Sequence, residues 1–163
     1  MNKLSLPALL SLFLVPLLLL SPAGGSASTQ VERTGHGNIV ATVSSSTIVF
    51  SGGGLTLYYI TGTDVFTGHV TGNATFTLNL LVLTSGADVG QGSITCTCTE
   101  GVHSGTIAID MVSAGTYGGA GSAQASQTGS GGLAGLQGQL TFLYNTTPTG
   151  FTARYLVQYE YTP

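Results

Sequence analysis

The final segment of the chain alternates apolar and mostly polar side chains over eleven residues, FTARYLVQYEY from Phe151 to Tyr161. Successive side chains of a β-strand point to opposite faces of the sheet, so this pattern predicts a strand with one aromatic face and one mostly polar face. Segments 75–83 (TFTLNLLVL) and 106–112 (TIAIDMV) alternate in the same way, and no long stretch carries a helical period. The chain is therefore predicted to be all-β.

Short glycine-bearing turns separate these segments, at residues 51–54, 67–72, 99–105 and 113–121. Strands joined by such turns at intervals of about 15 residues give roughly eight strands. A meander of that number can close on itself and remove its edges, whereas an open sheet this apolar would invite aggregation. We expect a single antiparallel β-barrel of about eight strands. A β-sandwich is the alternative, because alternation alone does not separate the two.

The N-terminus has the pattern of a secretory signal peptide. A positive start at residues 1–3 precedes an apolar run at residues 4–20 and a small-residue tail at residues 21–28. Two prolines inside the run, Pro7 and Pro16, favour cleavage over an uncleaved anchor, for which seventeen residues is the lower limit. We expect a signal peptide at residues 1–27, an N-terminal extension and first strand at 28–46, and the barrel domain at 47–163. The predicted location is secreted, periplasmic or extracellular.

Charged residues are scarce in the rest of the chain. After residue 27 six acidic residues accompany two arginines, which gives a net charge of about −4. Such a surface offers no basic patch for nucleic acid or for an anionic membrane surface. We therefore expect no nucleic-acid partner and no membrane insertion after signal cleavage. The oligomeric state is left open.

A dense run of glycines precedes the next-to-last predicted strand, in TGSGGLAGLQGQLTF at residues 128–142. Glycine permits a positive φ and a close approach of backbones, so the run predicts the sharp corner that a closing barrel needs. Leu133 and Leu136 would then plug inward from it. A phosphate-binding loop is rejected, because no lysine follows and no helix begins there. The predicted structural glycines are Gly129, Gly131, Gly132, Gly135 and Gly138.

This glycine pattern and the Tyr-rich strand after it resemble the end of a largely bacterial family of unknown function, whose pattern is G-x-G-x-L-x-G-L-x-G-x-x-x-F. FTGHVTG at residues 66–72 and EGVHSGTIAI at 100–109 resemble its two earlier hairpins. The family looks related to the allene-oxide-cyclase-like barrels, which also resemble the dirigent proteins. The resemblance implies an eight-stranded barrel whose interior can hold an apolar ligand. It places no catalytic residue on this chain, so catalytic residues remain unknown.

The two cysteines, Cys96 and Cys98, share one face of a predicted strand. In a regular strand their Cα atoms would lie about 6.7 Å apart, at the upper limit for a disulfide. Buried free thiols are therefore the first interpretation, and a local disulfide is the second. A metal site and an intermolecular bridge are weaker alternatives, the metal site because no second pair of ligands accompanies the cysteines.

Three histidines, His36, His69 and His103, lie in or beside glycine-rich turns. Scattered histidines in turns are usually solvated, so we expect no metal site and no cofactor. An enzyme would need an inward carboxylate, and the candidates are Asp64, Glu100 and Asp110. Asp110 is expected to point outward.

Aromatic side chains on the inward face are the candidate ligand contacts. Tyrosines supply apolar bulk with a hydroxyl that needs a partner, which suits a lumen that binds a mostly apolar molecule. The candidates are Tyr155, Tyr159, Tyr161, Phe76 and Phe142. These side chains would equally serve to fill the barrel.

The sequence thus predicts a secreted barrel of unknown biochemical activity, with a small apolar ligand in its lumen as the leading hypothesis. Whether the protein is an enzyme is left open. The alternatives are an isomerase or cyclase-like enzyme on the same barrel, a structural surface protein with a filled core, and an outer-membrane barrel with its apolar face outward.

Overall fold

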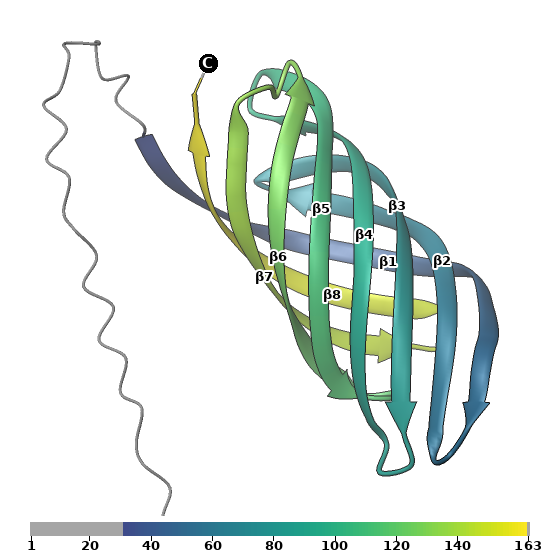
Figure 1. Ribbon diagram of the computed structural model, residues 1–163. Coiled ribbons are helices and arrows are strands. Elements are labelled where there is room, and N and C mark those ends of the chain that lie inside the picture. Colours follow the sequence, from purple (N-terminus) through teal and green to yellow (C-terminus); the bar gives the residue numbers. More distant parts are fainter. Residues whose placement is uncertain (1–30, 163) are drawn as a thin grey trace, which may run out of the picture.

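The computed structural model describes residues 31–162, and the predicted signal peptide at residues 1–27 lies outside them. Each strand pairs antiparallel with the next, and the last returns to the first, so the sheet is a closed barrel (Figure 1). This confirms the predicted eight-stranded antiparallel barrel over the sandwich. The strands are β1 (Val31–Gly52), β2 (Leu55–Gly68), β3 (Val70–Leu83), β4 (Ala87–Glu100), β5 (His103–Thr116), β6 (Ala120–Gly131), β7 (Leu136–Thr147) and β8 (Gly150–Tyr161).

The apolar face of each strand points into the barrel. In β8, Tyr155, Val157 and Tyr159 are buried, whereas Arg154 before them and Glu160 after them are exposed. An outer-membrane barrel needs the reverse arrangement, with its apolar side chains toward lipid. Residues 31–162 contain no helix that is long and apolar enough to cross a membrane.

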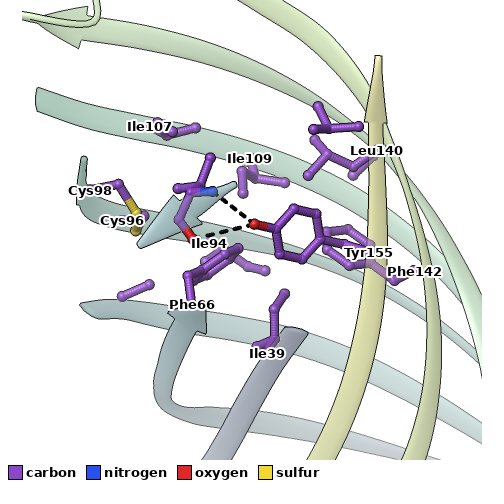
Figure 2. Packing of buried hydrophobic residues seen from close by; sticks show 14 of the residues in the cluster. Ile39, Phe66, Ile94, Cys96, Cys98, Ile107, Ile109, Leu140, Phe142 and Tyr155 are labelled. Atoms are coloured by element: carbon purple, nitrogen blue, oxygen red, sulfur yellow. Dashed lines mark hydrogen bonds between the residues drawn. A yellow bond between two sulfur atoms is a disulfide. The ribbon is translucent and has the colours of Figure 1, made fainter. Parts of the chain in front are cut away.

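Buried side chains from all eight strands form one core cluster, part of which surrounds Tyr155 (Figure 2). Ile107, Ile109 and Val157 are each no more than 2% exposed. Burying an aliphatic side chain of this size stabilises the fold by about 1.5–3 kcal/mol. Phe66 packs against Tyr155 with ring centroids 5.9 Å apart, which joins β2 to β8 across the interior.

The two ends of the barrel differ. The end that carries the β2–β3, β4–β5 and β6–β7 turns is called the closed end, because the β6–β7 turn folds inward there. Leu133 in that turn and Leu136 at the start of β7 are each 1% exposed. Backbone hydrogen bonds from Leu133 to Ser130 and from Leu136 to Leu133 hold the turn. The predicted corner with two inward leucines lies at this position.

The opposite end carries the β1–β2, β3–β4, β5–β6 and β7–β8 turns and is called the mouth. Here β1 extends beyond the first residue of β8, because the pairing of the two strands ends at Thr42 opposite Gly150. Beyond that point β1 pairs with β2 alone, and register shifts interrupt the pairing after Val43 and after Ile48. Residues 43–60 are called the arm, seen at the lower right of Figure 1. Since β1 runs unbroken through residues 46 and 47, the boundary predicted there falls inside a barrel strand.

The β6–β7 turn gives a prediction about stability. Gly135 has φ +88°, and a Cβ there would collide with the Thr162 carbonyl oxygen. Gly86 has φ +83° with open space around the same position, so it is the matched control. Gly86→Ala should lower the free energy of unfolding by about 1 kcal/mol through backbone strain alone. Gly135→Ala should cost at least about 1 kcal/mol more in urea unfolding. Equal losses would contradict the close packing of this turn.

Candidate functional site

A cavity of about 670 Å³ opens at the mouth of the barrel. Its walls are mainly apolar side chains that project inward from several strands. At the bottom of its lining lie Ile39, Phe76, Ile94, Ala123, Phe142 and Ala153, which belong to the buried core. Thr42, Val43 and Ser46 of β1 and the β7–β8 turn line the upper part. The half of the barrel near the closed end is therefore filled, and the half near the mouth is open.

Alternation and residue size explain why the cavity lies at the mouth. Ala123 and Ala153 occupy inward positions on β6 and β8, where larger side chains would fill the lumen. Phe151 packs edge-on against Phe76 with centroids 5.7 Å apart and lies 6.2 Å from the ring of Tyr144. The cavity is thus bordered by an aromatic wall and by alanines that leave it open.

One acidic side chain, that of Asp88, is among the residues that line the cavity. Asp88, near the start of β4, is 5% exposed and lines the cavity together with Ser113 and Tyr144. Burial raises the pKa of the Asp88 carboxyl, and a hydrogen bond with Tyr144 partly offsets this effect. Burial and the nearby Asp88 charge raise the pKa of the Tyr144 hydroxyl. The Oδ1 atom of Asp88 is buried and has no hydrogen-bond partner, which is unusual for a carboxyl oxygen.

The structure divides the predicted ligand contacts between the two ends. Phe76 and Phe142 line the mouth cavity, whereas Tyr155 borders only a void of about 10 Å³ within the packed half. Tyr159 and Tyr161 lie still farther along β8, toward the closed end. The reason is the direction of β8, which starts at the mouth and ends at the closed end.

The sequence pattern did not single out Asp88, Ser113 or Tyr144 as candidate site residues. A signal for Tyr144 was present, since it continues the alternation of Leu140 and Phe142 on the inward face of β7. Asp88 and Ser113 lie in neighbouring strands, and only the register brings them into one cavity.

At the closed end, polar side chains form a network over the packed core. The Nε2 atom of His69 lies 2.8 Å from the Tyr159 hydroxyl and 3.1 Å from Glu100 Oε1. Burial, followed by the Glu100 carboxylate, raises the pKa of Tyr159 to about 12. The backbone N–H of Val70 donates to the Tyr155 hydroxyl over 3.0 Å, shown by a dashed line in Figure 2. The network therefore ties the β2–β3 turn to β8.

Close packing holds the His69 ring in this network. The ring lies directly against Gly35 of β1, where a Cβ atom would collide with it. His103 instead lies beside Tyr161, with ring centroids 5.5 Å apart. Within the described range of residues, no three metal-ligating side chains come together.

Cys96 and Cys98 form a disulfide inside the barrel. Their Cα atoms are 5.4 Å apart, closer than the spacing expected for a regular strand, and both residues are buried. Of the two interpretations, the structure therefore has the local disulfide and not the buried free thiols.

Asp64 is the one predicted carboxylate candidate that lies fully inside the barrel. It is 1% exposed, and neither carboxylate oxygen has a hydrogen-bond partner. Its cross-strand neighbours are Ala41 and Ala74, which are too small and apolar to pair with it. Burial raises the pKa of Asp64 to about 7. Asp110 is exposed, as expected, and Glu100 belongs to the closed-end network.

The arrangement defines a small antiparallel barrel with one packed half and one apolar cavity that opens at an end. The chain matches no protein-family model and no curated protein sequence. In fold it is similar to the crystal structure of a protein of unknown function from the DUF3224 family of Shewanella oneidensis. The two share 14% identity with a TM-score of 0.61, and the match covers 82% of this chain and 99% of that one. This likeness shows the barrel fold, and the function of the neighbour is itself unknown.

The burial of Asp64 predicts how stability depends on pH. The folded-state pKa of about 7 lies above the ordinary value of 3.8, so the folded protein holds a proton that the unfolded chain has lost. Stability should therefore fall as pH rises from about 4 to about 7, by up to about 4 kcal/mol. Asp64→Asn should flatten this slope in urea unfolding measured across that range. Asp110→Asn, which removes one exposed carboxylate, is the matched control. If the pH dependence of the free energy of unfolding persists in Asp64→Asn, another group causes it.

Proposed function

We propose that this protein binds a small, mostly apolar molecule in the mouth cavity. The observation that carries the proposal is the cavity itself, whose volume of about 670 Å³ lies in the range of small-molecule sites. Its lining is mainly apolar, with a few polar groups gathered near Asp88. The resemblance of the sequence to the allene-oxide-cyclase-like barrels supports the same proposal, because it implies an interior that can hold an apolar ligand.

Asp88 narrows the proposed ligand class. Asp88 is among the residues that line the cavity, and a carboxylate accepts hydrogen bonds, so it favours a ligand whose polar group donates one, such as an alcohol or an amine. A carboxylate ligand would instead place two acidic groups together in a partly dry site. The proposed ligand is therefore an apolar molecule with one hydroxyl or amino group.

A location outside the cytoplasm is part of the proposal. The disulfide between Cys96 and Cys98 supports it, since such bonds persist in oxidising compartments. The pattern of residues 1–28 favours the same location.

Asp64 favours a second proposal, an isomerase or cyclase-like enzyme on the same barrel. A buried, unpartnered carboxyl with a pKa of about 7 is suited to accept or donate a proton near neutral pH. However, Asp64 is not among the residues that line the mouth cavity. Ligand binding without chemistry is therefore the proposal that the geometry supports best.

Filling the cavity tests the binding proposal. Ala123→Leu and Ala153→Leu each add a side chain to the cavity lining, whereas Ala108→Leu adds one to an exposed position on β5. The fluorescent apolar amine N-phenyl-1-naphthylamine should bind the unmodified protein saturably. Its affinity should fall at least about tenfold in both cavity variants and remain unchanged in the control. Saturable binding with the same affinity in the unmodified protein and in both cavity variants would contradict the proposed site.

The same site can be tested without a chosen ligand. Native and denaturing mass spectra of the protein secreted by its own host should differ by a small adduct that is lost on denaturation. The adduct should be absent from Ala123→Leu and retained by Ala108→Leu. An adduct that persists in the filled variant would place the ligand elsewhere.

The role of Asp88 gives a prediction about selectivity. Dodecanol should displace the naphthylamine at lower concentration than dodecanoate does, because Asp88 accepts the hydrogen bond of the alcohol. Asp88→Asn should narrow this preference by about fivefold or more. Equal preference in the two proteins would show that Asp88 does not contact the polar group of the ligand.

A further inference from the structure

The mouth of the barrel carries most of the large exposed apolar side chains. Ile48, Val49 and Phe50 on the arm are each more than half exposed. The other members of this surface are Leu55 and Tyr59 on the arm, Leu83 and Val89 beside the β3–β4 turn, and Tyr117 in the β5–β6 turn. We call this set the apolar rim. A solvent-facing group of this kind marks a contact surface.

Charged side chains lie mainly toward the closed end, opposite to the apolar rim. No charged residue occurs between Val40 and Asp64, so the whole arm is neutral. Among the described residues, the one ionisable carboxylate near the mouth, Asp88, is 5% exposed and faces the cavity. Glu32, Arg33, Glu100 and Glu160 all lie near the closed end, where Val102 is the exposed large apolar side chain. The molecule therefore has an apolar, neutral end and a charged end.

We propose that the apolar rim contacts the interface of a neutral lipid bilayer, so that the cavity exchanges its ligand with the membrane. This inference rests on the proposed function, because the surface matters to a ligand only if the cavity holds one. The arm supplies Val43 and Ser46 to the cavity lining, and Tyr117 of the rim lines the cavity as well, so the rim and the cavity are continuous. An apolar ligand would then leave lipid without crossing water.

The backbone limits how deep this contact goes. From residue 44 to residue 52, β1 lacks a neighbour on the side where β8 has ended, so its edge groups need water. Such groups are not tolerated within the hydrocarbon region. The rim therefore rests at the level of the headgroups, where Tyr59 and Tyr117 fit, because tyrosine has an apolar ring and a polar tip. The barrel does not span the bilayer.

Charge also selects the kind of membrane. The rim carries no lysine or arginine that would attract anionic lipid, and the net charge after residue 27 is about −4. Binding should therefore be stronger to phosphatidylcholine vesicles than to phosphatidylglycerol vesicles. On phosphatidylcholine it should change little between low and high salt, because apolar contact rather than charge drives it.

The test uses the protein as its host secretes it, with the N-terminus established by intact mass. The arm variant Ile48→Ser/Val49→Ser/Phe50→Ser removes three rim side chains, none of which lines the cavity. The matched variant Val102→Ser/Leu143→Ser/Leu156→Ser removes three exposed apolar side chains away from the mouth. In flotation with phosphatidylcholine vesicles, the arm variant should partition at least about tenfold less than the unmodified protein. The matched variant should partition like the unmodified protein, and equal partitioning of the two variants would overturn the inference.

A second measurement locates the contact. The chain contains no tryptophan, so Phe50→Trp and Val102→Trp each introduce a single fluorescent reporter. Brominated phosphatidylcholine should quench Phe50→Trp and leave Val102→Trp unchanged; the reverse, or no quenching of either, overturns the inference. If the unmodified protein binds no vesicles and the arm variant has a different oligomeric state in light scattering, the rim contacts a second copy. That result also overturns the inference.

Failure of this inference is distinguishable from failure of the proposed function. The arm variant keeps the cavity lining, so its affinity for N-phenyl-1-naphthylamine measured without vesicles reports on the cavity alone. Naphthylamine binding by the unmodified protein together with no vesicle binding by that same protein overturns the lipid contact and leaves the proposed function standing. Vesicle binding without saturable naphthylamine binding overturns the proposed function.

Discussion

The pairing of β1 with β8 is the interaction on which the rest of the structure depends. It joins Val31 through Thr42 to the whole of β8 and turns a meander into a ring. Closure removes two edges that would otherwise expose unpaired backbone groups, and it creates a single interior for the apolar faces. Because the pairing stops where β8 begins, it also releases the far half of β1 as the arm. Both the interior and the neutral rim follow from this one ladder.

The interior is divided by side-chain size. Toward the closed end, inward leucines, isoleucines and tyrosines fill the ring, and Leu133 and Leu136 close it from the turn. Toward the mouth, alanines at inward positions leave space that Phe76 and Phe142 border without filling. A barrel of this strand number has an interior that is either packed or open enough for one small ligand, and this protein has one packed half and one open half. The packed half supplies the stability that permits an open half.

Two buried carboxyl groups, those of Asp88 and Asp64, interrupt the mainly apolar interior, and their surroundings differ. Asp88 keeps Tyr144 as a neighbour and is among the residues that line the cavity. Asp64 has alanines on either side and no partner for either oxygen, so its burial lowers stability near neutral pH. An unsatisfied buried group is rare in folded proteins and persists where function maintains it. Asp64 is thus the strongest reason to consider proton transfer in this barrel.

The sequence alone determined the strands, their turns and their inward faces, because alternation and glycine position are local properties of the chain. FTARYLVQYEY is a strand with its tyrosines inward, as its pattern predicts, and the glycine run before β7 is the inward turn. Only the tertiary structure decided which inward residues lie at the same level of the barrel. That level depends on strand direction and on register between segments far apart in sequence. Strand direction and register place Tyr159 and Phe76 at different ends of the barrel and bring Asp88 beside Tyr144. They also leave Asp64 without a hydrogen-bond partner.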